Sequence, residues 1–284
     1  MSKILHIVPG TDDVANGMVV VARLLAKEQG DAEVIDLNQG MRHFCGSDIE
    51  EVWVHGMWLP KEWLVCWKAL RMVKRLVRMT HGSLSPVYLK HQSPFKKRLV
   101  SPIERYLIRR ADKIVATCEA EADWICAYEP RVKSIEVTNL KRFFNLPAVP
   151  CYQFPAFRPL HLLYLGRRHP LKGLDVLSSA LTLLHGVVPY EFRVVSNAYG
   201  EALEKVWDWC DVLVLPTLSE NFGLVIAEAL ERGKRVITTD GAPAWVDGNT
   251  YGGRLTYIND FLGGAIDVRI NLLKTAIMKI SGKI

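Results

Sequence analysis

Two acidic residues in the second half of the chain have types and spacing that could recognise a sugar. Glu220 follows a short apolar run, residues 212–215, and Glu228 interrupts a longer run of Leu, Val, Ile and Ala. A carboxylate within an apolar helix is costly unless donors satisfy it. Sugar and ribose hydroxyls are donors of that kind. The position of Glu228 is therefore compatible with a carboxylate that accepts hydrogen bonds from hydroxyl groups.

A plainer interpretation of the same acids stays open. Glu228 and Arg232 stand at i and i+4, where a surface ion pair contributes ~0.2–0.5 kcal/mol. Glu220 could act only through the favourable field at a helix N-terminus.

Two cations form a second group of chemical interest. Arg167 and Lys172 lie in the segment Gly166-Arg-Arg-His-Pro-Leu-Lys-Gly173, which follows the apolar run 160–165. Lysine and arginine can neutralise the charge of a departing diphosphate. The alternative is a pair of exposed surface cations without a ligand.

The elements around these residues predict a parallel sheet. Residues 212–215 read as a buried strand that Pro216 ends, because proline cannot donate to a sheet ladder. Ser219 or Asn221 is expected to cap a helix over 223–232, and a strand follows at 236–239. Ligands of parallel sheets bind outside the carboxyl ends of the strands, which here means residues 217–222.

The rest of the chain continues this alternation of strands and helices. We expect strands at 3–8, 32–37, 51–55, 113–117, 160–165 and 192–196, and helices at 18–29, 59–77, 102–110, 174–184 and 198–210, with one or two helices in 260–284. Cys118-Glu-Ala-Glu121 opens a further helix and also fits a capping box. Four prolines within 146–159 indicate an interdomain linker.

These motifs together resemble one enzyme family. The string Pro216-Thr-Leu-Ser-Glu-Asn-Phe-Gly-Leu-Val-Ile-Ala-Glu-Ala-Leu resembles the Glu-x7-Glu motif of retaining glycosyltransferases with the GT-B fold, closest to the group that builds lipopolysaccharide and other surface glycans. Gly241-Ala-Pro-Ala-Trp245 resembles that group's Pro-Trp loop. Met79-Thr-His-Gly-Ser-Leu-Ser-Pro86 resembles its His-Gly loop, and residues 166–173 match its Gly-Arg…Lys-Gly motif. The resemblance covers nearly the full chain.

The resemblance implies an α/β fold of two Rossmann-like domains that face each other across a cleft. Residues 1–157 would form the acceptor-side domain and residues 158–284 the nucleotide-sugar-binding domain, with a terminal helix that can cross back. Strand 192–196 is followed almost at once by helix 198–210, where the family places further units. We therefore expect an abbreviated second domain of four or five strands.

The resemblance also implies an activity. A hexose would move from a nucleotide diphosphate sugar, by default a UDP-hexose, to a glycan or glycolipid such as lipopolysaccharide core or exopolysaccharide, with retention at the anomeric carbon. His81 would face the reacting carbon and Glu220 would orient the sugar hydroxyls. Glu228 would bind the ribose. Donor binding would further involve Gly17, Arg167, Lys172, Asn221, Phe222, Gly223 and Leu224.

Two departures from the family's pattern bear on these expectations. The paired glycines of the first loop are reduced here to Asn16-Gly17, although Gly17 still precedes a helix N-terminus suited to an anion. Asp-x-Asp is absent, so we expect a metal-independent transferase with no cofactor beyond its donor substrate. Six cysteines without zinc-site spacing read as reduced core residues.

Composition and charge indicate the cellular setting. The 284 residues are 49% apolar and 23% charged, with no apolar run of the ~20 residues that a membrane span needs. The N-terminus lacks the features of a signal peptide, so we expect a cytoplasmic protein. Residues 61–113 hold 14 Lys or Arg against three acids, so the net charge of this basic segment is +11. Such a segment attracts nucleic acid, anionic lipid or phosphorylated glycolipid, and we expect peripheral contact with the inner face of the membrane.

Other functions stay open. Paired carboxylates occur in glycoside hydrolases, but the strand–loop–helix context and the Arg–Lys pair disfavour that class. A polyanion-binding protein would explain the basic segment, yet the chain has no helix-turn-helix, RNA-recognition or zinc motif, which makes nucleic acid the less favoured partner. A catalytically impaired GT-B partner subunit would explain the shortened second domain and the reduced glycine loop.

Overall fold

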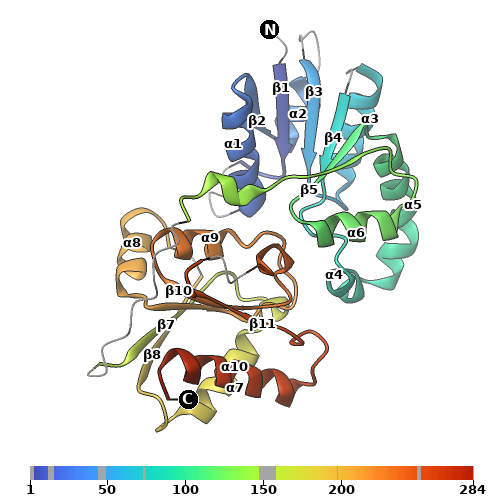
Figure 1. Ribbon diagram of the computed structural model, residues 1–284. Helices are drawn as coiled ribbons and strands as arrows, with labels where there is room; N and C mark the ends of the chain where they lie inside the picture. Colours follow the sequence, from blue (N-terminus) through green and yellow to red (C-terminus); the bar gives the residue numbers. More distant parts are fainter. Residues whose placement is uncertain are drawn as a thin grey trace. The chain divides into compact units, whose positions relative to one another are not determined.

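The computed structural model describes residues 3–11, 16–43, 49–72, 75–146, 158–196, 198–247 and 251–283. The chain divides into two compact units, Met1–Leu140 and Lys141–Ile284, each with parallel strands and covering helices (Figure 1). The sequence predicts the division after residue 157. Residues 147–157, which make up most of the expected linker at 146–159, lie outside the described residues.

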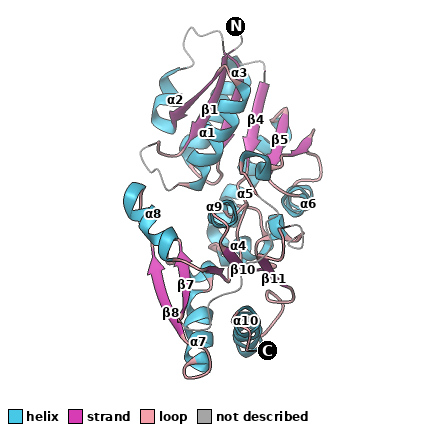
Figure 2. Cartoon of the chain, turned by 60° about the vertical axis from the view of Figure 1, so that its left-hand side comes forward, coloured by secondary structure: helices cyan, strands magenta, loops and turns pink. Residues whose placement is uncertain are grey.

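The first unit is built on a six-stranded parallel sheet of order β2-β1-β3-β4-β5-β6. Its elements are β1 (Lys3–Val8), α1 (Gly17–Gln29), β2 (Ala32–Asp36), α2 (Leu37–His43), β3 (Ile49–His55), α3 (Pro60–Met72), β4 (Arg75–Met79), α4 (Pro86–His91), α5 (Pro94–Arg110), β5 (Lys113–Ala116), α6 (Glu119–Tyr128) and β6 (Ile135–Val137). The central strands are apolar runs because both faces of a parallel sheet are covered by helices. Helix α3 contacts both α2 and α5, and helices flank the strands of this unit (Figure 2).

The expected helix over residues 59–77 is wrong at its C-terminal end. Helix α3 ends at Met72, and Arg75–Met79 form the strand β4 between β3 and β5. The pattern Leu-Arg-Met…Arg-Leu-Val-Arg-Met fits a helix locally. Pairing with two neighbouring strands overrides that preference, because it buries Leu76, Val77 and Met79 in the sheet.

Arg78 shows the consequence of this correction. The sequence counts it within the basic segment 61–113, but its side chain is only 1% exposed. Its Nη1 donates to Glu104 Oε2 at 2.9 Å and its Nη2 donates to the carbonyl of Gly56 at 3.2 Å. Glu104 Oε1 also accepts from the Trp58 amide at 2.6 Å and from Trp63 Nε1 at 2.8 Å. Arg78 therefore ties β4 to α5 and adds nothing to the exposed basic surface.

The second unit is built on a five-stranded parallel sheet of order β11-β10-β9-β7-β8, within the predicted four or five strands. Its elements are β7 (Leu160–Leu165), the 3-10 turn η2 (Pro170–Lys172), α7 (Leu174–Leu184), β8 (Tyr190–Val195), α8 (Gly200–Trp209), β9 (Val212–Leu215), α9 (Leu224–Glu231), β10 (Arg235–Thr239), the 3-10 turn η3 (Pro243–Trp245), β11 (Leu255–Ile258) and α10 (Ile266–Ile280). Helix α10 packs against α7 on one side of the sheet (Figure 1).

Both sheets contain a point where the strand order reverses. In the first sheet, β1 leads to β2 on one side while β3 lies on its other side. In the second sheet, β7 leads to β8 on one side while β9 lies on its other side. Loops that leave two such neighbouring strands diverge to opposite faces, which opens a crevice where ligands of α/β sheets bind. The topology therefore directs attention to the loops after β1, β3, β7 and β9.

We predict that Glu104→Ala costs about 3–5 kcal/mol in the free energy of unfolding, because it leaves the buried Arg78 guanidinium without a counter-charge. Glu136→Ala is the matched control. It removes the partner of Lys113 from a pair whose carboxylate is 55% exposed, and should cost under about 1 kcal/mol. Urea unfolding of the two variants makes the comparison, and equal losses would contradict the structural role of Arg78.

Candidate active site

Three loops meet at the carboxyl ends of β7, β9 and β10. The carbonyl of Leu171, in the loop after β7, accepts from the Leu218 amide at 2.8 Å and from Thr217 Oγ1 at 3.0 Å, both in the loop after β9. The Glu220 amide in turn donates to the carbonyl of Gly241, after β10, at 2.8 Å. Backbone groups thus fix the three loops at the switch point of the second sheet.

Two glycines allow these loops to approach so closely. Gly173 has φ +67°, and a Cβ there would lie 2.1 Å from the carbonyl oxygen of Pro216. A Cβ at Gly241 would lie 2.1 Å from the carbonyl oxygen of Thr217. Any side chain at either position would push the loops apart.

The structure brings together Lys172 and Glu220, as the sequence predicts. Lys172 Nζ donates to Glu220 Oε2 in an ion pair whose side chains are 22% and 17% exposed. His169 holds the turn before Lys172, because its Nδ1 accepts from the Leu171 amide at 3.2 Å. The nearby Tyr164 has its pKa raised to about 12 by burial and by the charge of Glu220, against the opposing charge of Arg168. The site is thus partly shielded from water, which strengthens its electrostatic interactions.

Arg167 lies in the same loop as Lys172, with an exposed side chain, and its carbonyl accepts from the Tyr164 hydroxyl at 3.1 Å. The ion pair therefore joins only one of the two predicted cations to Glu220.

The start of α9 differs from the predicted cap. The N-cap is Gly223, with φ 73° and ψ 64°, and neither Ser219 nor Asn221 occupies that position. The left-handed backbone at Gly223 turns the chain into the helix, so no capping side chain is used there. Leu224 is the first helical residue. Phe222 is 3% exposed, and its ring centroid lies 5.3 Å from that of Trp245.

Glu228 lies one turn into α9 and is half-buried. Burial and the charges of Glu231 and Glu204 raise the pKa of its carboxyl group, and Arg232 opposes them. The Arg232 side chain donates to the carbonyl of Glu228 and, through Nη2, to the carboxylate of Glu204 at 2.8 Å. The i, i+4 surface pair is therefore wrong: Arg232 pairs with Glu204, and among the described residues no hydrogen bond reaches the carboxylate of Glu228.

In the first unit, His81 follows β4 in a loop that a buried carboxylate holds. Its backbone has φ 48°, in the left-handed region. Glu121 Oε1 accepts from Thr80 Oγ1 and from the Gly82 amide, both at 2.6 Å, on either side of His81. Glu121 Oε2 accepts from the amide and hydroxyl of Thr117, each at 2.8 Å. Glu121 is fully buried and anchors the His-Gly loop to the end of β5.

The predicted capping box is therefore not formed. Cys118 is the N-cap of α6 but makes no side-chain cap hydrogen bond, and Glu121 bonds the neighbouring loop instead. The sequence did not predict that Glu121 holds the His-Gly loop, because Gly82 in that loop is 39 residues away along the chain.

Two further histidines connect to His81, and sequence analysis assigned neither a role. His55 Nδ1 lies 2.9 Å from His81 Nε2, and His6 Nδ1 lies 2.9 Å from His55 Nε2. His6 Nε2 lies 2.7 Å from Gln29 Oε1. His6 is a polar residue inside the apolar run of β1, and this was the sequence feature that could have indicated a buried polar contact.

The predicted donor-binding residue Gly17 begins α1 and is exposed.

Comparison with known proteins agrees with this architecture. A model of the glycosyl transferase 4-like domain matches residues 10–139, and a model of glycosyl transferases group 1 matches residues 190–262. Together the two matches cover more than half of the chain. The chain belongs to this family of glycosyltransferases. The first match contains His81 and the second contains Glu220 and Glu228, while Lys172 lies between the matches.

Similar solved structures show that this chain has the GT-B fold. Sucrose-phosphate synthase from Thermosynechococcus elongatus is 14% identical with a TM-score of 0.70, over 99% of this chain and 91% of that chain. The lipopolysaccharide outer core galactosyltransferase WaaB is 15% identical with a TM-score of 0.64, over 99% and 91%. Anabaena Alr3699/HepE, solved in complex with UDP-glucose, is 16% identical with a TM-score of 0.63, over 98% and 90%.

A curated relative is an uncharacterized 41.2 kDa protein in the cps region of Klebsiella pneumoniae. It is 24% identical over an alignment of 175 positions, and the alignment covers 52% of this chain and 48% of that protein. The match thus spans about half the length of the relative.

We predict that Gly173→Ala is far more destabilising than Gly186→Ala. Both glycines have positive φ, +67° and +77°, so each substitution carries the ~1–2 kcal/mol of a left-handed alanine. Only the Cβ at Gly173 meets a carbonyl oxygen, and overpacking adds about 1–3 kcal/mol. Thermal unfolding of the two variants measures the difference. Similar losses would show that the loops after β7 and β9 are not held in this contact.

Proposed function

We propose that this glycosyltransferase moves a hexose from a nucleotide diphosphate sugar, by default a UDP-hexose, to a hydroxyl of a glycan or glycolipid such as lipopolysaccharide core or exopolysaccharide, with retention at the anomeric carbon. The observation that carries the proposal is the Lys172–Glu220 ion pair at the switch point between β7 and β9. There a cation for the diphosphate and a carboxylate for the sugar lie side by side.

The charges of the reaction assign roles to the residues of the second unit. As the bond from the sugar to the phosphate lengthens, negative charge grows on the diphosphate and positive charge on the sugar. Lys172 and Arg167 would stabilise the diphosphate, together with the amides of Gly223 and Leu224 at the positive end of α9. No metal ion is required in this scheme.

Carboxylates and an imidazole would orient the donor. Glu220 would accept hydrogen bonds from the sugar hydroxyls, and Glu228, whose carboxylate makes no hydrogen bond within the described residues, would accept from the ribose. Asn221 and Phe222 would line this part of the site. His81 would accept a hydrogen bond from a hydroxyl of the transferred sugar, and Gly17 would approach the donor's anionic group at the start of α1. The UDP-glucose complex of a protein with this fold supports a nucleotide-sugar donor.

A catalytically impaired partner subunit is the second candidate, favoured by the single Gly17 in place of paired glycines. Turnover of a donor by the purified chain separates the two candidates.

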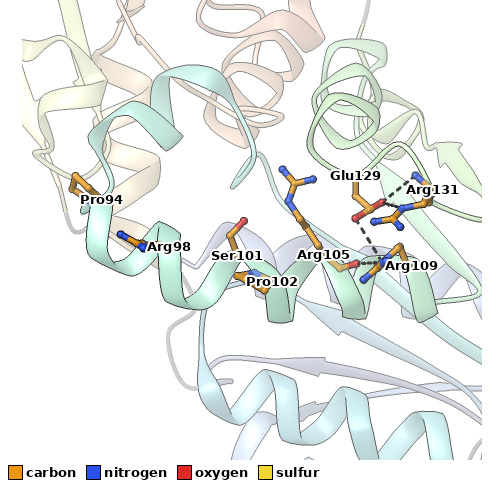
Figure 3. A pocket seen from close by; sticks show the side chains of 8 residues that line it. All are labelled: Pro94, Arg98, Ser101, Pro102, Arg105, Arg109, Glu129 and Arg131. Atoms are coloured by element: carbon orange, nitrogen blue, oxygen red, sulfur yellow. Dashed lines mark hydrogen bonds and ion pairs between the residues drawn. The ribbon is translucent and has the colours of Figure 1, made fainter.

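A hollow with many arginine side chains lies along α5 and the turn after α6. Its volume is about 620 Å³, and it is lined by Pro94, Arg98, Ser101, Pro102, Arg105, Arg109, Glu129 and Arg131 (Figure 3). The buried Glu129 carboxylate lies 3.1 Å from Arg131 Nε and 3.6 Å from Arg109 Nε, at one end of the hollow. Four guanidinium groups against one carboxylate leave this hollow strongly cationic.

A smaller hollow of about 230 Å³ is lined by residues of α3 and α5. They are Trp67, Leu70, Arg71, Tyr106 and Arg110. The side chains of Trp67 and Tyr106 are 49% and 43% exposed. Exposed aromatic side chains beside arginines are the composition of a surface that rests on anionic lipid headgroups. We therefore propose that the surface along α5 that holds both hollows contacts an anionic membrane, and that the protein works as a peripheral protein of the cytoplasmic side. No helix in the described part of the chain is both long and apolar enough to cross a bilayer.

We predict that Glu220→Ala lowers the rate of sugar transfer by a factor of about 10²–10³, the effect of removing one oriented polar group from an active site. The fold should persist because the Glu220 amide, which bonds Gly241, is retained. Glu201→Ala, at an exposed ion pair in α8, is the control. The measurement is release of nucleotide diphosphate from a panel of nucleotide sugars, with circular dichroism as the check on folding. Near-normal turnover by Glu220→Ala would refute its role.

We also predict that the double variant Arg98→Gln/Arg105→Gln binds anionic vesicles more weakly, by ~1 kcal/mol for each lost charge near the surface. Lys279→Gln/Lys283→Gln removes the same charge elsewhere and should bind as the wild type does. Co-sedimentation with phosphatidylglycerol vesicles at two salt concentrations gives the readout. Equal binding by both variants would place the membrane contact elsewhere. The side chains of Lys96 and Lys97, in the same basic segment, lie outside the described residues.

A further inference from the structure

A continuous chain of hydrogen bonds runs from the end of α1 to the His-Gly loop. It passes from Gln29 to His6 on β1, to His55 at the end of β3, and to His81 after β4, with contacts of 2.7, 2.9 and 2.9 Å. His6 and His55 are fully buried, and His6 also stacks on Trp53 at a centroid distance of 4.9 Å. The strand order β1-β3-β4 places the three imidazoles in a row, one from each neighbouring strand or its loop.

All three imidazoles are neutral at physiological pH. Burial lowers the pKa of His6 to about 4, despite the opposing hydrogen bond to Gln29. Burial likewise lowers the pKa of His81 to about 4. Burial and the neighbouring His81 and His6 hold the pKa of His55 well below its ordinary value. Within the described residues no group of three or more His, Cys, Asp and Glu side chains is arranged to hold a metal ion.

Proton counting then leaves only two arrangements. A neutral imidazole has one N–H donor and one acceptor nitrogen. Both ring nitrogens of His6 and of His55 are engaged, so each of these rings donates on one side and accepts on the other, and all the bonds must point the same way along the chain. In one arrangement each ring donates toward Gln29. In the other, Gln29 donates to His6, His6 donates to His55 and His55 donates to His81.

In the structure Gln29 presents its carbonyl oxygen Oε1 to His6, which corresponds to the first arrangement. His6 must then donate from Nε2, which leaves its Nδ1 as the acceptor for His55 Nε2–H. His55 Nδ1 in turn accepts from His81 Nε2–H. The proton of His81 is thereby fixed on Nε2, and its Nδ1 has an unshared electron pair.

We propose that Gln29, acting through His6 and His55, is a positioning residue that fixes His81 as a hydrogen-bond acceptor at Nδ1, toward a hydroxyl of the bound ligand. The part of this statement that names the ligand rests on the proposed function, while the direction of the hydrogen-bond chain does not. Glu121 complements this arrangement because it holds the backbone on either side of His81. Glu121 thus holds the backbone around His81, and the chain from Gln29 sets the tautomer of its imidazole.

The chain direction has a chemical consequence for recognition. An acceptor nitrogen can receive a hydroxyl proton, whereas an Nδ1–H would require an acceptor on the ligand instead. A sugar hydroxyl held by Nδ1 leaves its oxygen with more electron density, which favours positive charge on the sugar during bond cleavage. The two arrangements therefore differ at the ligand in whether the proton of His81 is on Nε2 or on Nδ1.

The first test measures the tautomer directly. The full-length protein is labelled with ¹⁵N-histidine, and long-range ¹H–¹⁵N correlation spectra are recorded at pH 7.5, with single histidine substitutions for assignment. We expect His81, His55 and His6 each to have a proton on Nε2 and none on Nδ1. A proton on Nδ1 of His81 in the wild type would overturn the proposal, without any need for a variant to fold.

The second test reverses the chain. Gln29→Lys replaces the acceptor with an ammonium group that can only donate, so the proton of His81 should move to Nδ1. Glu28→Gln makes the same change of net charge at the adjacent, exposed position of α1 and should leave the tautomer unchanged. If Gln29→Lys folds and His81 keeps its proton on Nε2, the control attributed to Gln29 is wrong.

Turnover separates this inference from the proposed function. If both hold, Gln29→Lys lowers kcat about tenfold, the worth of one hydrogen bond, with KM nearly unchanged. Glu28→Gln keeps wild-type kcat. If the tautomers follow expectation but the wild type turns over no nucleotide sugar, the hydrogen-bond chain stands and the proposed function fails. If the tautomer of His81 reverses in Gln29→Lys with no change in kcat, the role of Nδ1 toward a ligand hydroxyl is refuted.

Discussion

The pairing of Lys172 with Glu220 is the interaction on which the second unit's site depends. An ammonium and a carboxylate attract each other strongly only where water is partly excluded and both chains are held in place. Here both conditions are met, because the side chains are mostly covered and the two loops share backbone hydrogen bonds at Leu171. The strand order supplies the location, since β7 and β9 are the neighbours at which the sheet reverses.

Close backbone approach is the constraint that makes this geometry possible. Gly173 and Gly241 lie where a methyl group would overlap a carbonyl oxygen of the neighbouring loop. Gly223 plays a related part at the start of α9, where a left-handed residue replaces a capping side chain. Glycine is required at these positions because the loops lie close together, and not because the loops need to be flexible. The polar side chains between them, Lys172 and Glu220, are then presented by a backbone with little freedom to rearrange.

The first unit reaches its candidate site by a different route, through buried polar side chains. Glu121 satisfies four donors and thereby holds the His-Gly loop, and the three imidazoles satisfy one another in the interior of the sheet. Buried polar groups are expensive unless every donor and acceptor has a partner. The buried Arg78 also pairs with Glu104, although its Nε donor has no partner among the described residues. In this unit the candidate site and its support are held by three sets of buried polar side chains.

The sequence alone determined what short-range pattern can determine. Apolar runs ended by proline or glycine gave most strands and helices, and the Lys172 and Glu220 motifs lay on the predicted loops, because strand periodicity and turn chemistry are local properties. Only the tertiary structure decided that residues 75–79 form a strand, that Arg78 is buried, that Arg232 pairs with Glu204, and that His6 and His55 reach His81. Each of these depends on contacts between segments far apart in the chain, and sheet pairing there outweighs local preference.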